Sequence, residues 1–98
     1  MRKGDGNMKL TQVELTKQPQ KYLAKADSKT YKKLRKALDG LEKWEGDIKR
    51  LENNNYYRLK IPQYRLIFTY DGKINIISVK EIDSRTNIKY RRYAKWQS

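Results

Sequence analysis

Basic residues are the most abundant side chains in this sequence that could carry chemistry. The chain has 98 residues, with 24 Lys and Arg against 11 Asp and Glu, and it contains neither His nor Cys. Without His it lacks the commonest general base and metal ligand, and without Cys it lacks disulfides and thiolate metal sites. The acids Asp71, Glu81 and Asp83 are too scattered to indicate a metal site. Any reaction must therefore use Lys, Arg, Tyr or carboxylates, and we expect no metal and no small-molecule cofactor.

The net charge of +13 favours a polyanionic partner, because each phosphate that a cation neutralises releases condensed counterions. Nucleic acid is the first expectation for such a chain, with an anionic membrane surface or an acidic protein as alternatives. No apolar run approaches the roughly 20 residues that cross a bilayer. The opening MRKGDGN also lacks the apolar segment of a signal peptide. We therefore expect a cytoplasmic protein.

The elements that hold the cations begin with a strand and two helices. Residues 1–7 are expected to be a disordered leader, and residues 8–98 a single domain. A first strand is predicted at 8–16 and a short helix at 17–27. The clearest helix runs from Ser28, as its N-cap, to about Glu45, because leucines recur there at three- and four-residue spacing. The following EGDIKRLENNN is expected to be a connector.

From residue 56 the hydrophobic period changes to two. The segments YYRLKI, YRLIFTY and KINIISVKE predict three strands, joined at Pro62-Gln63 and Asp71-Gly72. Joints this short predict an antiparallel meander. The tail IDSRTNIKYRRYAKWQS is expected to form a short basic helix or an arm. The fold class is therefore α+β, with an N-terminal strand, a two-helix hairpin and a three-stranded meander in one sheet, and with the helices on one face.

Even-length hairpin loops would sort the strand side chains into two faces. On the outer face Lys60 stands opposite Arg65, Arg65 stands opposite Ser78, and Arg58 and Lys80 lie near them. Like charges opposed across a strand pair are destabilising, and the strands offer no obvious acidic partner. This cluster is either a solvated face of a basic protein or a site that holds an anion. The core face should carry Tyr57, Leu59, Ile61, Tyr64, Leu66, Phe68, Tyr70, Ile77 and Val79.

The order of elements, with LENNNYYRLKIPQYRLIFTYDGKINIISVKEIDSR and a tyrosine beyond it, resembles the RelE/ParE superfamily of bacterial and archaeal toxins. The resemblance covers residues 8–93. It implies a small toxin that is neutralised by a co-encoded antitoxin. In the RelE-like branch the toxin cuts mRNA in the ribosomal A site with basic residues, and in the ParE-like branch the same fold inhibits DNA gyrase.

Matched position by position, the resemblance implies roles for individual residues. Arg65 would contact the scissile phosphate, with Arg85 assisting. Lys60 would take a proton as base, since nearby cations favour the uncharged amine that a base needs. Tyr90, with Tyr93 as second choice, would stack on a base or supply a proton. The remaining RNA contacts are expected from Arg58, Lys80, Arg91, Arg92 and Tyr93.

Three functions compete at this point. The first is a ribosome-dependent mRNA endonuclease, whose partners would be the cognate antitoxin, mRNA in the A site and ribosomal RNA. The second is a gyrase inhibitor of the same fold, and the third is a non-toxic basic protein that binds nucleic acid. The basic set with a C-terminal tyrosine favours the first. Two departures from the family pattern are an Arg-x-Lys pair in place of Lys-x-Lys and a shift of about two residues after Val79.

Overall fold

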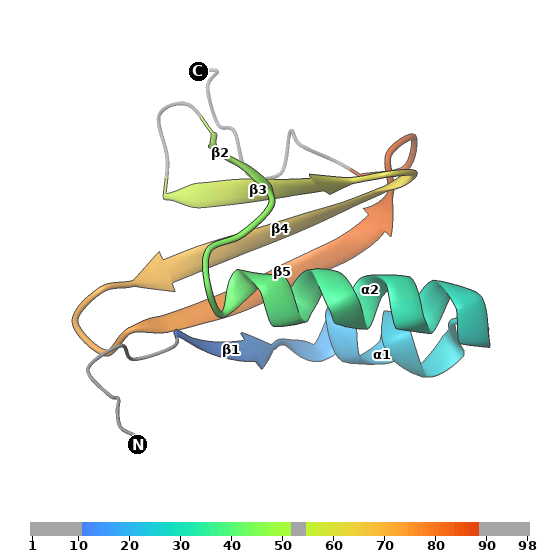
Figure 1. The fold of residues 1–98 in the computed structure, drawn as a ribbon, viewed down its shortest axis with the longest axis horizontal. Helices are drawn as coiled ribbons and strands as arrows, with labels where there is room; N and C mark the ends of the chain where they lie inside the picture. The colour runs from blue at the N-terminus through green and yellow to red at the C-terminus, as the bar shows by residue number, and fades with distance from the viewer. Residues whose placement is uncertain (1–10, 52–54, 89–98) are drawn as a thin grey trace.

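The protein consists of two helices packed on one side of a five-stranded sheet (Figure 1). The computed structural model describes residues 11–51 and 55–88. Within this part of the chain neither helix is long and apolar enough to cross a membrane. The elements are β1 (Gln12–Leu15), α1 (Lys17–Lys25), α2 (Ser28–Leu41), β2 (Asp47–Arg50), β3 (Tyr56–Ile61), β4 (Tyr64–Asp71) and β5 (Ile76–Ser84).

The strand order in the sheet is β1-β5-β4-β3-β2. The meander β3–β4–β5 is antiparallel throughout, as the short joints predict, whereas β1 pairs with β5 in parallel. A parallel pair needs a long crossover, and the two helices with the rest of the sheet provide it. The α+β class and the arrangement of the N-terminal strand, helical hairpin and meander are confirmed. The predicted C-terminal helix or arm lies largely outside the described residues.

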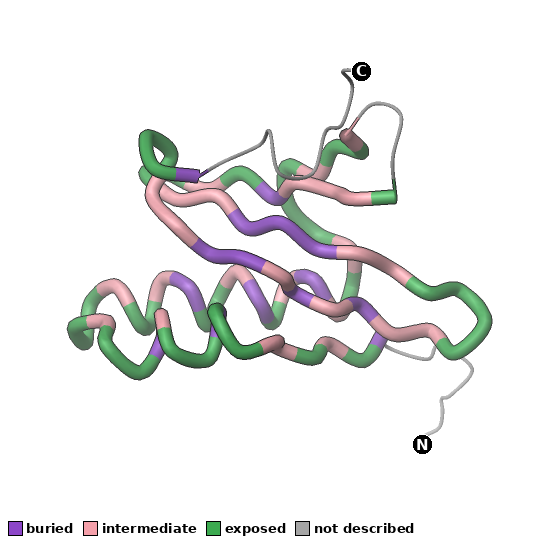
Figure 2. Tube along the Cα trace, turned by 180° about the vertical axis from the view of Figure 1, so that it is seen from behind, coloured by how far each residue is buried: buried purple, intermediate pink, exposed green. Residues whose placement is uncertain are grey.

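The core lies between the helices and the inner face of the sheet. Leu34, Leu38 and Leu41 of α2 are almost fully buried against Leu66 and Phe68 of β4. Figure 2 shows the buried positions running through the middle of the sheet and recurring along one side of α2. Every residue predicted for the core face belongs to this cluster or packs against it. The period-two pattern therefore identified the inner face correctly.

Both ends of α2 differ from the prediction. Asp27, and not Ser28, is the N-cap: its carboxylate accepts a hydrogen bond from the Thr30 amide at 2.8 Å. A carboxylate there satisfies a free backbone donor and faces the positive end of the helix dipole. The helix ends at Leu41, where the Gly40 carbonyl accepts from the Lys43 amide, at 3.0 Å, in place of a helical partner.

The turn after α2 places Trp44 against the inner face of the sheet. Trp44 has a φ of 56° and Gly46 a φ of 122°, so both residues are in left-handed conformations. This reversal turns the Trp44 ring onto Tyr57, Phe68 and Tyr70, with ring centroids 5.6, 5.8 and 5.1 Å away. Edge-on contacts of this kind are favourable for aromatic pairs. Trp44 is partly buried and packs against the core cluster.

Two features of the sheet were not predicted. The segment expected to be a connector contains β2, which pairs with β3 so that Asp47 lies opposite Lys60. The β4–β5 turn spans residues 72–75, two residues longer than predicted, and a bulge follows at Ile67/Phe68. Arg65 therefore lies opposite Asp83 and not Ser78. Since the longer turn still has an even number of residues, the core face predicted for the strands was unaffected.

Candidate functional site

The β3–β4 hairpin positions the first two cations of the site. Its two-residue turn, Pro62-Gln63, pairs Lys60 directly with Arg65, as predicted. Proline followed by a residue with positive φ fits a type II turn, and Gln63 has a φ of 71°. The turn therefore fixes the register that brings the two cations together on the outer face.

Arg65 is anchored at the end of this hairpin. Its Nη1 donates to the carbonyl oxygens of Ile61 and Tyr64 at 2.9 and 2.8 Å. The side chain is half-buried, and no packing in the core is disturbed, because it points away from the helices. A guanidinium carries five N–H donors in a fixed plane. Anchoring through one nitrogen thus orients the group and leaves its other donors for a ligand.

Arg85 reaches the same place from the far end of β5. Its amide donates to the Gln63 carbonyl at 3.0 Å, which holds the chain after β5 against the hairpin turn. The chain turns again directly after β5. In this turn the Ser84 carbonyl accepts a hydrogen bond from the Ile88 amide at 3.0 Å, and the Ile88 side chain is buried. Two segments far apart in sequence are joined at this point by backbone contacts, which sequence patterns could not reveal.

Lys60, Arg65 and Arg85 line one pocket together with Asp47, Ile61, Pro62 and Gln63, with a volume of about 240 Å³. We call this the cationic pocket. It brings three side chains of the predicted site together around one small space. A pocket of this kind suits a single anionic group, because guanidinium and ammonium donors can converge on its oxygens.

Asp47 is the residue of this pocket that sequence analysis missed. Its Oδ1 lies 3.2 Å from Nη2 of Arg58, so the outer face does contain an acidic partner, contrary to expectation. The Arg58 side chain is 19% exposed and its Nε is buried without a hydrogen-bond partner among the described residues. The available signal was weak, since only the alternation in DIKR hinted at a strand.

The other predicted residues are not in the cationic pocket. Lys80 is the extra residue of the β5 bulge, between Val79, which pairs with Phe68, and Glu81. It does not line the pocket, although a regular strand would have placed it on the face of Arg65. Tyr90, Arg91, Arg92 and Tyr93 lie outside the described residues, so their predicted roles stay predictions.

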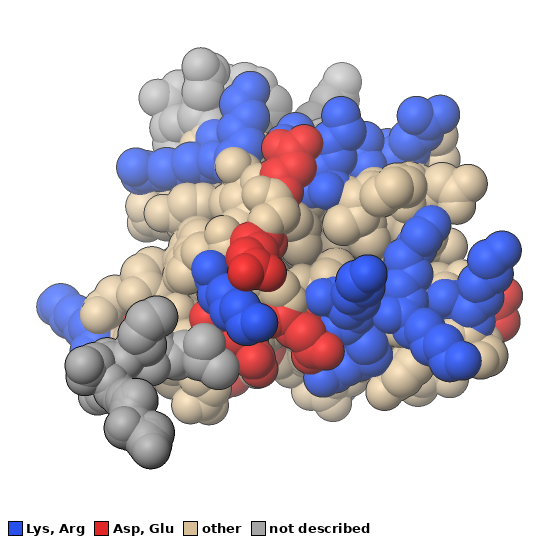
Figure 3. All heavy atoms as spheres, viewed as in Figure 1, with Lys and Arg blue, Asp and Glu red and all other residues tan. Residues whose placement is uncertain are grey.

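The helical side of the molecule is also strongly charged. In Figure 3, Lys and Arg side chains cover much of the helical side and the upper part of the sheet, with a few acids between them. On the other side of the sheet, Tyr22 packs edge-on against Tyr64, with ring centroids 6.5 Å apart. Burial raises the pKa of Tyr22, and the carboxylate of Asp83 raises this pKa further. Both effects keep the phenol neutral in the physiological range.

No protein-family model matches the sequence, and no curated protein sequence matches it. Solved structures do match. A chain of the archaeal RelE–RelB complex from Pyrococcus horikoshii aligns with a TM-score of 0.67 at 23% identity, over 81% of this chain and 99% of that one. A chain of the RelBE2 toxin–antitoxin complex from Mycobacterium tuberculosis aligns with a TM-score of 0.63 at 19% identity, over 78% and 99%.

The isolated E. coli RelE toxin also aligns with this chain. Its TM-score is 0.59 at 19% identity, over 84% of this chain and 92% of that one. Coverage of nearly the whole length of each structure means that the likeness includes the sheet and both helices rather than one motif. The chain therefore has the fold of the RelE toxins.

Proposed function

We propose that this protein is the toxin of a type II toxin–antitoxin pair and acts in the cytoplasm as a ribosome-dependent endoribonuclease. The observation that carries the proposal is the cationic pocket, where Lys60, Arg65 and Arg85 meet within the fold of the RelE toxins. Fold alone does not define a function, so the proposal rests on this convergence of side chains. The expected partners are an antitoxin, mRNA in the ribosomal A site and ribosomal RNA.

The proposed reaction is cleavage of RNA by its own 2′-hydroxyl. The 2′-oxygen forms a bond to the adjacent phosphorus, its proton passes to a base, and the bond from phosphorus to the 5′-oxygen breaks. That 5′-oxygen leaves with a proton. The products are a 2′,3′-cyclic phosphate and a free 5′-hydroxyl. The step needs no water or external reactant, and its main demand is stabilisation of the extra charge on phosphorus.

The pocket residues suit the separate parts of this reaction. The anchored guanidinium of Arg65 can donate to non-bridging oxygens of the phosphate, with Arg85 on the same side of the pocket. Lys60, directly opposite Arg65, is assigned the role of the base that accepts the proton of the 2′-hydroxyl. Arg58 is assigned to a neighbouring phosphate. Tyr90 is assigned to orientation of a base or donation of the proton to the leaving oxygen.

The proposal is tested by inducible expression in bacteria of the native chain, Arg65→Ala and the matched control Lys73→Ala. Lys73 is an exposed cation in the β4–β5 turn, away from the pocket. We expect the native chain and Lys73→Ala to stop translation, and toeprinting on programmed ribosomes to show cleavage within the A-site codon. Loss of one charge-stabilising donor typically costs about 10²–10³ in rate, so Arg65→Ala should cut at least that much more slowly.

Other outcomes contradict the proposal. If translation continues while a DNA-damage response rises, the protein acts as a gyrase inhibitor of the same fold. If the native chain slows neither growth nor translation, it is not a toxin. If Lys73→Ala loses activity as fully as Arg65→Ala, general positive charge rather than the pocket is responsible.

A further inference from the structure

Arg85 enters the cationic pocket from a short turn that follows β5. We call residues 84–88 the Arg85 turn. Its middle residues Arg85, Thr86 and Asn87 are exposed, Ser84 is half-buried, and Ile88 at its end is buried. An exposed arginine on such a turn can adopt many conformations, because its side chain has several rotatable bonds. Its place at the pocket therefore depends on what holds the turn.

Ser84 binds the rest of the Arg85 turn. Its carbonyl oxygen accepts from the amides of Asn87 and Ile88 at 3.1 and 3.0 Å. Its hydroxyl oxygen accepts from the Asn87 amide at 3.2 Å and lies 3.3 Å from the hydroxyl of Thr86. Serine hydroxyls that bind nearby backbone amides in this way stabilise turns. Ser84 thus contacts each of the three residues that follow Arg85.

The Arg85 turn is also fixed to the strands beside it. Asp83, the residue before the turn, accepts from the Ser84 amide through Oδ1 at 2.8 Å, although Arg65 is its partner across the sheet. The Arg85 amide donates to the Gln63 carbonyl at 3.0 Å. Among the described residues, no ion pair joins Arg65 or Arg85 to an acid. The two guanidinium groups therefore keep their charge for a ligand.

We propose that Ser84 is a positioning residue, which keeps the Arg85 turn closed and so holds the Arg85 guanidinium at the cationic pocket before RNA binds. This rests on the proposed function, because the guanidinium is placed there to stabilise charge on the phosphate. Ser84 does not line the pocket, so it acts through Arg85 and not on RNA directly. Donors that are already in place need no reorganisation during the reaction, and a misplacement of 1 Å can cost as much as about 10² in rate.

The test is a double-mutant cycle on the full-length chain, with Ser84→Ala, Arg85→Ala and the double variant. Cleavage is followed on programmed ribosomes, and kcat and KM are measured separately. We expect Ser84→Ala to lower kcat about five- to fiftyfold and to change KM less than about twofold. In the Arg85→Ala background the same change should alter kcat less than about twofold, because no guanidinium is left to position.

Hydrogen exchange gives a second measurement that needs no cleavage. It uses chains that carry Arg65→Ala, so that they can be produced whether or not the native chain is toxic. The Arg85 amide, bound to the Gln63 carbonyl, should exchange at least about tenfold faster with Ser84→Ala, whereas the amide of Leu66 in the middle of the sheet should not change.

Two further variants serve as controls. Ser84→Thr keeps the hydroxyl and should retain both the cleavage rate and the slow exchange of the Arg85 amide. Ser78→Ala removes a hydroxyl from the same strand, away from the pocket and the Arg85 turn, and should change neither by more than about twofold. Circular dichroism and Tm show whether each variant is folded.

Several results would overturn the proposal. One is an equal loss of kcat on Ser84→Ala with and without Arg85, which would mean that the serine acts independently of it. Another is an equal effect of Ser78→Ala, which would indicate a general weakening of β5. If the native chain cuts RNA and Ser84→Ala changes neither cleavage nor exchange, only this inference is wrong. If the native chain does not cut RNA and Ser84→Ala still speeds exchange at Arg85, the proposed function fails and the ordering of Arg85 by Ser84 stands.

Discussion

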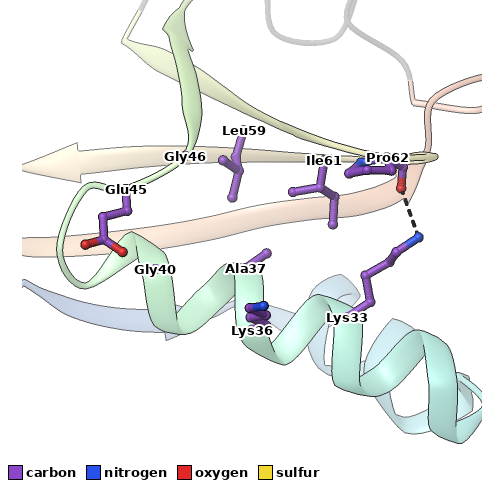
Figure 4. A pocket seen from close by; sticks show the side chains of 9 residues that line it. All are labelled: Lys33, Lys36, Ala37, Gly40, Glu45, Gly46, Leu59, Ile61 and Pro62. Carbon is purple, nitrogen blue, oxygen red and sulfur yellow. Dashed lines mark hydrogen bonds between the residues drawn. The ribbon is translucent and has the colours of Figure 1, made fainter.

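The two sides of β3 carry two different surfaces. Lys60 on the outer side lines the cationic pocket, while its neighbours Leu59 and Ile61 on the inner side line an apolar groove between α2 and β3 (Figure 4). The alternation of a strand separates these chemistries within three consecutive residues. The Pro62 turn borders both hollows, so a change there would affect both. The comparison teaches that the two faces can be changed independently by substitution on the same strand, because adjacent residues point to opposite sides of the sheet.

The largest expected effect separates the two sides completely. Arg65→Ala should reduce RNA cleavage by about 10²–10³, whereas Ala37→Trp, which fills the hollow between α2 and β3, should leave cleavage within about twofold. Toeprinting measures the cleavage, and circular dichroism with Tm shows whether each variant is folded. Arg65→Lys serves as a control that keeps the charge and loses the planar donor fork. An equal loss of cleavage in both variants would show that the two surfaces are coupled.

A stability comparison tests the inner side. Gly46→Ala should destabilise the fold by about 1–3 kcal/mol, because Gly46 has a φ of 122° and the new Cβ would meet Leu59. Gly40→Ala is the control: its Cβ would make only ordinary contacts, 3.5 Å from the Glu45 carbonyl, within a helix. It should stabilise the fold by up to about 1 kcal/mol. Urea unfolding measures both, and equal effects at the two glycines would contradict this account.

On the outer side, Asp47→Asn tests the acid in the cationic pocket. Removing this charge takes away an internal competitor for Arg58 and for the anion, so a non-cleavable RNA with 2′-deoxy at the cut site should bind more tightly. Exposed ion pairs are worth about 0.2–1 kcal/mol, and Asp47 is 59% exposed, so the gain should be at most about fivefold. Fluorescence anisotropy at two salt concentrations measures it.

The control for the Asp47 experiment is Asp71→Asn. This residue is exposed at the opposite end of β4, away from the pocket, and removes the same charge from the chain. If it tightens RNA binding as much as Asp47→Asn does, net charge explains the gain. Weaker binding on Asp47→Asn would instead mean that the carboxylate helps to hold Arg58 in place for the ligand.

The smallest effect is expected far from both surfaces, at the N-cap of α2. The Thr30 amide hydrogen bond lowers the pKa of Asp27, so its ionised form is favoured by folding. The resulting stability is fully present above the ordinary pKa of about 3.9 and is lost as the pH falls through the lower folded value. Asp27→Ala should therefore lower Tm at neutral pH, with the difference shrinking in acid. Cleavage should not change, and a pH-independent difference in Tm would contradict the capping role.

Much of the fold could be predicted because its signals are local. Leucine spacing identified α2 to within a few residues, and period-two alternation identified the whole inner face of β3 and β4. The pair formed by Lys60 and Arg65 was predictable because a two-residue turn lies between their strands. The end of α2 was not predictable from local patterns. There the Gly40 carbonyl accepts from the Lys43 and Glu45 amides, and Trp44 takes a left-handed conformation that brings its ring onto the aromatic residues of the sheet.

The features around the site that could not be predicted from the sequence depend on pairing between distant segments. Asp47 has no strong strand propensity, and β2 exists because it pairs with β3. Asp83 lies opposite Arg65 because the β4–β5 turn is two residues longer than predicted and a bulge displaces β5 by one further residue. Sequence patterns carry no marker for either event.

The sequence by itself determined which residues are cations, which face of each central strand is apolar, and that Lys60 and Arg65 meet, because these features depend on neighbours a few residues away. The tertiary structure decided that Arg85 joins them, through its amide on the Gln63 carbonyl, and that Asp47 faces Lys60. It also decided that α2 and β3 leave an apolar groove between them. These features depend on how helices and strands that are distant in sequence pack together. That packing is decided by the free energy of the whole chain and not by neighbouring residues alone.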